Sequence, residues 1–475
     1  MKNSRFQIGI SSHLVAKLSV VSFAYLLHFT LGRLLSVAEY GLIGTIITLS
    51  NFYYLFLTNG IRQSISNAIA INSFNTKDII VKGITLQIGF ALLLSIVNVF
   101  LAPTLSTLLG NEDYAMYYSF ISVLIPFTAL YFAGTGVLNG LKLFVRESLV
   151  TILYPFLRLS AILFILNRPQ SKPMGVINGF ILGSFITSLI TWILIIRSTR
   201  KLTLSDLDRP RIKTTKLLKN SFSFIASFGA ITIVLNLDTL FLQYIKKDLT
   251  LTGLYTGVHT FSLVPYYLVS AFYLVILPYI SEYYEKSDKY KIRELLKKTV
   301  SIVMLFVFPI VFLISISGGK LLSLFYNPDY FVAGNALAIL CMGTFILSIY
   351  AIFTVALIGL KENKKAGVCS LVLVVADIIF QFFFTQQSGL IGLASGTFVS
   401  SLISCLLIYY FLVVKTGNFI GAKLIYSVLI HLLPFLFLSV LILRVISITN
   451  LITLFLVWAG ILLPYYLITI KMNKI

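Results

Sequence analysis

Long apolar runs, separated by short polar segments, follow one another along the whole chain. A helix needs about 20 mostly apolar residues to cross the hydrocarbon core of a bilayer. The pattern therefore predicts an all-α integral membrane protein with short loops and about fourteen transmembrane helices. We place these helices at residues 9–32, 42–60, 83–102, 116–139, 148–167, 175–196, 221–244, 252–278, 299–317, 334–358, 366–385, 389–414, 424–443 and 447–470.

The composition supports a membrane class. Apolar residues make up 58% of the 475 residues and charged residues only 11%, whereas a soluble domain carries about 25% charged residues. The chain holds 37 Lys and Arg against 16 Asp and Glu, a net charge of +21. Such an excess collects in the cytoplasmic loops of multispanning proteins, so we attribute it to topology and expect no nucleic-acid partner.

The Lys and Arg residues are concentrated in every second loop. With the N-terminus inside, the cytoplasmic segments hold 28 Lys and Arg and the outer segments hold 7. This bias predicts a multi-pass protein of the cytoplasmic (inner) membrane, with an even number of spans and both termini in the cytoplasm. The apolar run within Met1 to Leu31 lacks a small-x-small cleavage site, so we expect an uncleaved first span. The basic stretch from Glu282 to Lys298 is expected to lie on the inner leaflet as an amphipathic segment.

Two pairs of segments match each other in the same order. Residues 179–190 (GFILGSFITSLI) match residues 392–403 (GLASGTFVSSLI), and both contain a GxxxG pattern that lets helices approach closely. Residues 138–142 (LNGLK) match residues 357–361 (LIGLK). The matching segments lie six spans apart, an even number, so the pattern predicts a parallel repeat of the kind that transporters use.

The repeat gives a domain organisation. We expect an N-terminal six-helix lobe at residues 1–200 and a basic cytoplasmic linker at residues 201–220. A second six-helix lobe is expected at residues 221–415, and two additional transmembrane helices at residues 416–475. A substrate path would then lie between the two lobes.

A few charged side chains lie inside the predicted spans, where each costs a few kcal/mol and is expected to face water, a partner or a substrate. These are Lys17, Arg158, Asp238 and Asp377. Lys17 also lies close enough to the inner headgroups to extend toward them. Asp238 has the alternative of a buried hydrogen bond to Asn236.

The repeat relates two of these charges. Arg158 follows Lys142 by 16 residues, and Asp377 follows Lys361 by 16 residues. Arg158 and Asp377 are therefore expected at equivalent positions of the fifth and eleventh spans, facing each other across a central cavity. The alternative is a buried ion pair that only fixes packing.

No motif for catalysis, a metal or a cofactor is apparent. Cys341, Cys369 and Cys405 lie in apolar stretches without the spacing of a metal site or a disulfide framework. We also find no P-loop, nucleophile elbow or paired acids. We therefore expect no enzyme activity, no catalytic residue, no metal and no cofactor, while coupling to an H+ or Na+ gradient stays open.

Several segments resemble one known family. Residues 31–41 (LGRLLSVAEYG) resemble the GR-L-S-x-x-EYG signature of polysaccharide-export flippases. Residues 253–255 (GLY), 263–265 (LVP) and 277–281 (LPYIS) resemble the matching pattern of the eighth span, and residues 389–397 (GLIGLASGT) resemble GixGAAxAT of the twelfth. The chain thus resembles the Wzx-type repeat-unit flippases of the multidrug/oligosaccharidyl-lipid/polysaccharide (MOP) exporter superfamily.

The resemblance implies two lobes around a cavity that opens alternately to each side. It implies as substrate an oligosaccharide on undecaprenyl pyrophosphate, for O-antigen, capsule or exopolysaccharide synthesis. Membrane lipids, a polysaccharide polymerase and chain-length machinery would be the further partners. A pyrophosphate needs cations to cross hydrocarbon, and Arg158, Lys17 and Arg62 are our candidates. Asp377, which stands where the family commonly has Asn, and Asp238 are candidates for ion coupling.

Other functions fit parts of the sequence. A cation-coupled multidrug or small-molecule exporter of the same superfamily would use the two intramembrane acids to bind cations. A lipid II flippase would share the fourteen spans. A membrane glycosyltransferase or repeat-unit polymerase generally has a large outer loop, which the predicted topology lacks.

Overall fold

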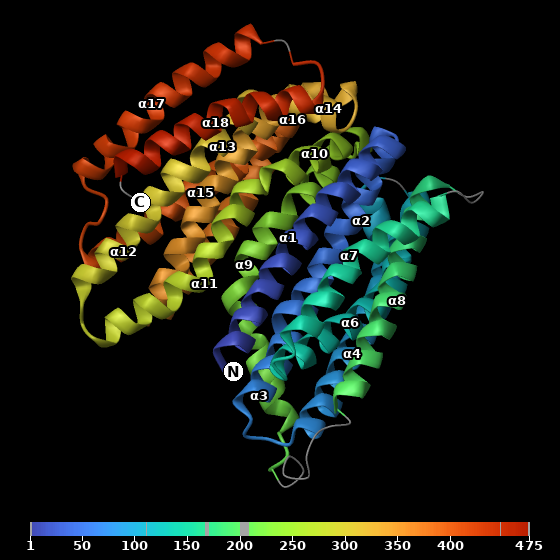
Figure 1. The fold of residues 1–475 in the computed structure, drawn as a ribbon. Helices are drawn as coiled ribbons and strands as arrows, with labels where there is room; N and C mark the ends of the chain where they lie inside the picture. Colours follow the sequence, from blue (N-terminus) through green and yellow to red (C-terminus); the bar gives the residue numbers. More distant parts are fainter. Residues whose placement is uncertain (1, 111, 167–170, 200–208, 447, 474–475) are drawn as a thin grey trace. The chain divides into compact units, whose positions relative to one another are not determined.

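The computed structural model describes residues 2–473 except 111, 167–170, 200–208 and 447 (Figure 1). Within these residues every regular element is a helix, which confirms the predicted fold class. Eleven helices in the described part of the chain are long and apolar enough to cross a membrane. One of them, α16 (Asn363–Thr416), holds both the eleventh and the twelfth predicted span.

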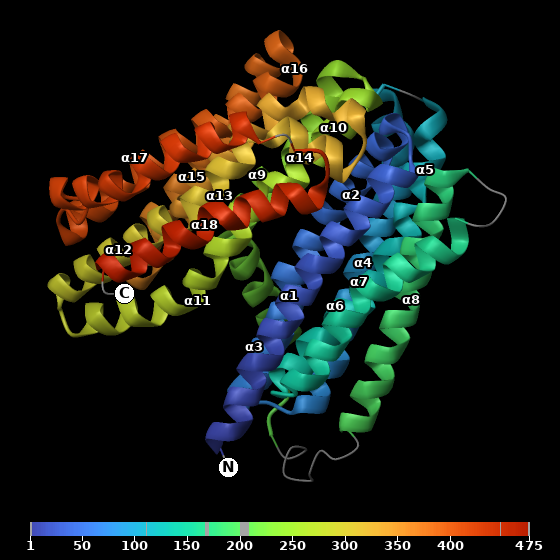
Figure 2. The same cartoon turned by 45° about the horizontal axis from the view of Figure 1, so that its top comes forward.

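The chain divides into two compact units, residues 1–253 and 254–475. The first unit ends within α10, and its helices are α1 (Lys2–Leu34), α2 (Val37–Phe56), η1 (Leu57–Arg62), α3 (Gln63–Ile71), α4 (Thr76–Leu108), η2 (Glu112–Tyr114), α5 (Ala115–Ser119), α6 (Ile121–Gly140), α7 (Phe144–Leu166), α8 (Lys172–Thr199), α9 (Thr214–Lys246) and α10 (Leu249–Ser262). Within this unit α1, α7 and α8 run side by side (Figure 2).

The second unit begins at Leu254. Besides the rest of α10 and α16, it contains α11 (Val264–Glu285), α12 (Lys289–Ile302), η4 (Val303–Val307), α13 (Phe308–Ile316), α14 (Gly318–Phe325), η5 (Pro328–Ala333), α15 (Gly334–Gly359), α17 (Ala422–Val445) and α18 (Leu451–Asn473). The division places α9 with the first unit, whereas the sequence repeat assigns it to the second lobe. The repeat-based lobes stay a prediction.

One predicted element differs from the structure. The eighth span was expected as one helix over 252–278, but it is interrupted at Leu263 between α10 and α11. Pro265 lies in the first turn of α11, where the missing backbone N–H of a proline is tolerated. In the interior of an unbroken helix the same position would have to donate a backbone hydrogen bond. The amphipathic segment expected at Glu282–Lys298 corresponds to the end of α11 and most of α12, which continues through η4 into α13. Its position on the inner leaflet stays a prediction.

The turn after the fourth span has the same geometry as the turn after the tenth span. Lys142 and Lys361 both have left-handed backbone, with φ of 58° and 61°. In each case the next residue donates its backbone N–H to a carbonyl five residues earlier, over 2.9 Å: Leu143 to Leu138 and Glu362 to Leu357. This hydrogen-bond pattern closes a helix C-terminus, so the matching sequences build matching helix ends.

The two GxxxG patterns each bring a pair of neighbouring helices together. A Cβ atom on Gly183 of α8 would lie 2.5 Å from Cα of Arg158 in α7, and one on Gly396 would lie 2.7 Å from Cα of Gln381 within α16. Gly389 separates the two spans of α16 with φ 55° and ψ −122°, a conformation that glycine adopts readily. The expected role of these glycines in close helix packing is confirmed.

Candidate functional site

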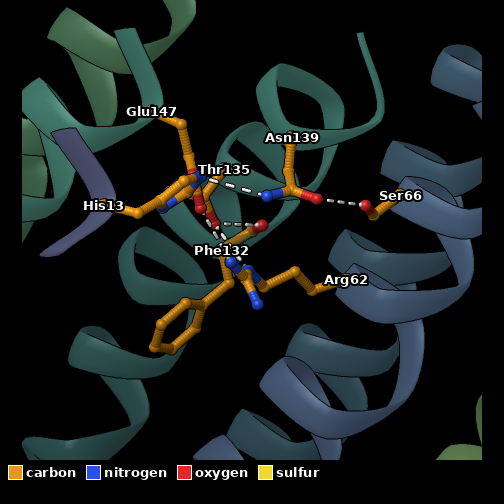
Figure 3. A network of polar contacts seen from close by, with 7 residues as sticks. All are labelled: His13, Arg62, Ser66, Phe132, Thr135, Asn139 and Glu147. Atoms are coloured by element: carbon orange, nitrogen blue, oxygen red, sulfur yellow. Dashed lines mark hydrogen bonds and ion pairs between the residues drawn. The ribbon is translucent and has the colours of Figure 1, made fainter. Parts of the chain in front are cut away.

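A buried glutamate organises a polar network in the first unit (Figure 3). Glu147 lies in the first turn of α7 and is only 4% exposed. Its Oε1 lies 3.1 Å from Nη2 of Arg62, and its Oε2 lies 3.1 Å from Nε2 of His13 on α1. An acid buried to this degree is stable as a carboxylate only if cations and hydrogen-bond donors surround it, and Arg62 supplies both.

The backbone around Arg62 explains its position. Arg62 is the last residue of the π-helical segment η1, and segments of this kind are frequent at functional sites. Gly136 of α6 permits close contact here, because a Cβ atom at this position would lie 2.7 Å from the Arg62 carbonyl oxygen. Nε of Arg62 donates to Oγ1 of Thr135 over 2.9 Å, and Thr135 donates to the carbonyl of Phe132. The guanidinium is thus oriented from α6 and α7 together.

Asn139 extends the network toward α3. Its Nδ2 donates to Oε2 of Glu147 over 3.4 Å, while its Oδ1 accepts a hydrogen bond of 2.8 Å from Ser66 (Figure 3). Hydrogen-bonded chains of this kind hold side chains in one arrangement. The Arg62 side chain is nevertheless 27% exposed.

A second cation lies among aromatic rings further along α7. Nη1 of Arg158 donates to the hydroxyl of Tyr154 over 3.0 Å, and its Cζ lies 4.0 Å from the ring centroid of Phe180. The Tyr154 ring stacks on Tyr131 of α6 with a centroid distance of 4.3 Å and an interplanar angle of 3°. The rings hold Arg158 by cation–π attraction without neutralising its charge, so it can still bind an anion.

The first unit thus brings Arg62 and Arg158 into one set of neighbouring helices. On α6, Thr135 contacts Arg62, and Tyr131 one turn earlier stacks on Tyr154, whose hydroxyl accepts from Arg158. Lys17, the third candidate cation, is exposed on α1 and lies one turn beyond His13, so the two side chains share a face of that helix.

The two candidate coupling acids are both buried. Asp377 is fully buried in α16, where its Oδ2 accepts 2.9 Å from Gln381 and its Oδ1 accepts 2.7 Å from Ser400. Asp238 is 2% exposed in α9. The expected partner of Asp238, Asn236, accepts from Asn51 over 2.8 Å and donates to a backbone carbonyl.

The packing changes the expected equivalence of Arg158 and Asp377. Counted from the repeated turn, both are the sixteenth residue, as predicted. The contacts of the GxxxG glycines give a different pairing. Gly183 lies against Arg158, whereas Gly396 lies against Gln381, which is one helical turn beyond Asp377. The second hairpin is therefore shifted by one turn, and Gln381 is the packing counterpart of Arg158. A direct pair between Arg158 and Asp377 stays a prediction.

Sequence reasoning missed the centre of the network. Glu147 lies one residue before the predicted fifth span, within a predicted loop. His13 was inside the first span but had no assigned partner. The available signal was that Glu147 is an acid at the edge of an apolar run, in a loop that otherwise carries Lys142 and Arg146.

The signature of residues 31–41 has a structural explanation. Ser36 caps α2 by accepting from the backbone N–H of Glu39, and Glu39 accepts from the backbone N–H of Ser36, a capping box. Gly41 and Gly253 then permit α2 and α10 to touch. A Cβ atom on Gly41 would lie 2.0 Å from the Leu249 carbonyl oxygen, closer than any real contact.

Comparisons with known proteins agree with this architecture. Residues 8–284, more than half of the chain, match the family described as polysaccharide biosynthesis protein, and residues 224–383 match the MatE family. A probable low-salt glycan biosynthesis flippase of Haloferax volcanii is 22% identical over 152 residues, which cover 32% of this chain and 31% of that protein. The chain thus spans about a third of the length of this curated relative.

Solved structures share the fold. The lipid II flippase MurJ, in an inward closed conformation, superimposes with a TM-score of 0.76 and 17% identity, covering 98% of this chain and 100% of that one. An inward-facing multidrug resistance MATE transporter of the MOP superfamily gives a TM-score of 0.70 and 15% identity, covering 85% and 99%. At these identities the likeness concerns the fold.

Proposed function

The chain belongs to the polysaccharide biosynthesis protein family, and from this premise we propose that it is a flippase for a lipid-linked oligosaccharide. The substrate would be a repeat unit on undecaprenyl pyrophosphate, moved across the cytoplasmic membrane by alternating access. Membrane lipids, a polysaccharide polymerase and chain-length machinery would be its partners.

The observation that carries this proposal is the pair of arginines in the first unit. Arg62 is oriented by Thr135 and Glu147 and is 27% exposed, while Arg158 lies against the rings of Phe180 and Tyr154. A pyrophosphate cannot enter hydrocarbon unshielded, and guanidinium groups bind phosphate oxygens in a bidentate manner. Two preoriented guanidinium groups on neighbouring helices suit such a group.

Glu147 gives Arg62 an internal anion when no substrate is present. The carboxylate neutralises the arginine and lowers the cost of holding it inside the protein. An entering pyrophosphate would replace Glu147 at the guanidinium, and His13 would remain beside the released carboxylate. We assign to Lys17, exposed one turn from His13, the role of a first cation for the substrate.

Asp377 and Asp238 remain our candidates for coupling to H+ or Na+. Both acids are buried in helices of the apolar part of the chain, where an ionisable side chain commonly marks a path for ions or protons. The hydrogen bonds that Asp377 accepts from Gln381 and Ser400 come from neutral side chains. A charge swap, Arg158→Asp with Asp377→Arg, tests the proposed pair: restored folding with poor transport supports a substrate role for Arg158, and full transport refutes it.

The proposal is tested with the purified full-length chain in liposomes. A fluorescent undecaprenyl-pyrophosphate oligosaccharide is supplied in the inner leaflet, and its appearance outside is measured by cleavage with an added glycosidase. We expect Arg62→Ala and Arg158→Ala to abolish transport. Arg444→Ala, which removes an exposed cation in the last turn of α17, is the matched control and should transport normally.

Two alternatives are separated by exchanging the substrate. Transport of lipid II in preference to the oligosaccharide would favour a lipid II flippase, which also requires pyrophosphate binding. Transport of a cationic dye driven by an H+ or Na+ gradient, without movement of either lipid, would favour a multidrug exporter and overturn the proposal.

A further inference from the structure

A basic cavity lies at the end of the first unit where α3 meets α4 and α9 begins. Its volume is about 450 Å3. It is lined by Phe74, Arg211, Lys213, Thr215, Lys216 and Lys219. Four of these six residues are cations and none is an acid, so the cavity combines a concave shape with positive charge. Neither the family signature nor the arginine site described above includes it.

The chain before α9 is fixed to the turn between α3 and α4. The backbone N–H of Asn75 donates to the carbonyl of Pro210 over 3.1 Å. Oδ2 of Asp78 accepts from the backbone N–H of Ile212 over 2.9 Å and from Nζ of Lys82 over 2.9 Å. Lys82 also donates to the Ile212 carbonyl over 2.8 Å. Asp78 is therefore engaged in holding this segment.

The first turn of α9 is anchored in the core while its cations stay outside. Ile212 and Leu217 are each 1% exposed and belong to the apolar core of the first unit. Ser64 of α3 donates to the Leu217 carbonyl over 2.9 Å. In contrast, Lys213 and Lys219 are exposed. The backbone that carries the cations is thus held in place before any ligand arrives.

Phe74 forms one wall of the cavity and orients a lysine. Nζ of Lys216 lies 4.5 Å from the centroid of the Phe74 ring. This cation–π contact positions Lys216 without supplying a negative charge. Like charges gathered in one cavity repel each other, and an anion bound among them would relieve this repulsion. The amide groups at the start of α9 add a partial positive charge.

We propose that this basic cavity binds a phosphate group. The charge asymmetry of the loops predicts that the cavity lies on the cytoplasmic side, where anionic phospholipids concentrate basic segments. The phosphate could be presented by a lipid headgroup or by a soluble phosphate compound, and both provide oxygens for several lysines at once. This proposal does not depend on the proposed transport function, because it concerns residues outside the arginine site.

The test has one experiment for each source of phosphate. The full-length chain is examined by native mass spectrometry in mixed micelles with phosphatidylglycerol or phosphatidylcholine. It is also titrated calorimetrically with inorganic pyrophosphate, with Arg62→Ala/Arg158→Ala present in every variant so that the arginine site does not contribute. The variant Lys213→Gln/Lys216→Gln/Lys219→Gln removes three cations. Each basic residue near a membrane surface contributes about fivefold to anion binding, so we expect a loss on the order of 100-fold.

The matched control removes the same charge from another basic segment. Lys289→Gln/Lys297→Gln/Lys298→Gln changes three exposed lysines of α12. It should retain binding, and replacing Lys213, Lys216 and Lys219 by arginine should retain it too. If only phosphatidylglycerol binding is lost, the ligand is a lipid headgroup. If only pyrophosphate binding is lost, the ligand is a soluble phosphate compound.

Two results would overturn the proposal. One is an equal loss of binding in the test and control variants, which would show a general effect of charge. The other is unchanged binding in the test variant in both experiments. Gel filtration and thermal unfolding of each variant confirm that it is folded, so that lost binding is not mistaken for lost structure.

Discussion

Replacing Glu147 by glutamine tests whether Arg62 carries an internal counter-ion. The substitution keeps the shape of the side chain but removes the charge that Arg62 and His13 contact at 3.1 Å. Removal of one partner from a fully buried ion pair costs about 3–5 kcal/mol. Because Arg62 is 27% and His13 38% exposed, solvent screens part of this loss, and we expect Glu147→Gln to lower the free energy of unfolding by about 1–3 kcal/mol.

The measurement is a double-mutant cycle in detergent micelles, with unfolding followed during SDS titration. Glu147→Gln, Arg62→Met and the double variant are compared with the wild type. If the two side chains stabilise each other, the losses should be non-additive by at least about 1 kcal/mol. Methionine preserves the apolar stem of the arginine, so the comparison isolates the charged group.

The same variant should bind substrate more tightly. In the wild type, a pyrophosphate must displace Glu147 from Arg62, so the free energy of that contact is subtracted from the binding energy. Removing the charge of Glu147 is expected to raise the affinity for a pyrophosphate lipid by roughly tenfold, equivalent to about 1.4 kcal/mol. Titration of the lipid with the variant and the wild type measures this directly.

Two outcomes would refute this reasoning. Additive losses in the cycle, within about 0.5 kcal/mol, would mean that Glu147 stabilises the protein independently of Arg62. Weaker substrate binding in Glu147→Gln would mean that the carboxylate supports the bound state and does not compete with the substrate.

Further substitutions test the packing, the second arginine and a pH-dependent contact. Gly41→Ala should destabilise the protein by about 1–3 kcal/mol because of its contact with α10, whereas Gly460→Ala, which has open space, should be neutral; thermal unfolding compares them. In the liposome assay Arg158→Lys should retain part of the transport that Arg158→Ala loses, since an ammonium still attracts phosphate. The hydrogen bond from Lys415 holds the pKa of Glu362 below its ordinary value of 4.5. The contact therefore stabilises the folded protein above pH 4.5, and this stabilisation should disappear as the pH falls through the lower pKa of the folded state. Acid titration of Lys415→Gln should show a smaller change, and an equal change would contradict this assignment.

The sequence predicted the helical membrane fold because its signal is strong. Apolar runs of span length and matched GxxxG segments leave few alternatives, and the structure places Gly183 and Gly396 at close helix contacts. The break at Leu263 was not predicted, because the apolar pattern continues across it and Pro265 can also lie within a kinked helix.

The candidate site was predicted less completely. Arg158 was identified because charge is costly in an apolar run, and Arg62 because it lies at the inner end of the second predicted span. The structure gives both arginines oriented positions. Glu147 was missed because the span boundary fell one residue after it. The equivalence of Arg158 and Asp377 depended on counting along the chain, whereas packing depends on how two helices meet, and there the second pair of helices is shifted by one turn.

The contact between Gly41 and Gly253 has a consequence for classifying proteins of this family. Both glycines belong to segments that carry the family resemblance, and here they allow the backbones of α2 and α10 to contact each other. A search keyed to these segments therefore groups proteins by architecture, and exporters of unrelated cargo can satisfy it equally well. Cargo would be inferred more directly from the residue types at positions 62, 147 and 158, which lie outside that contact.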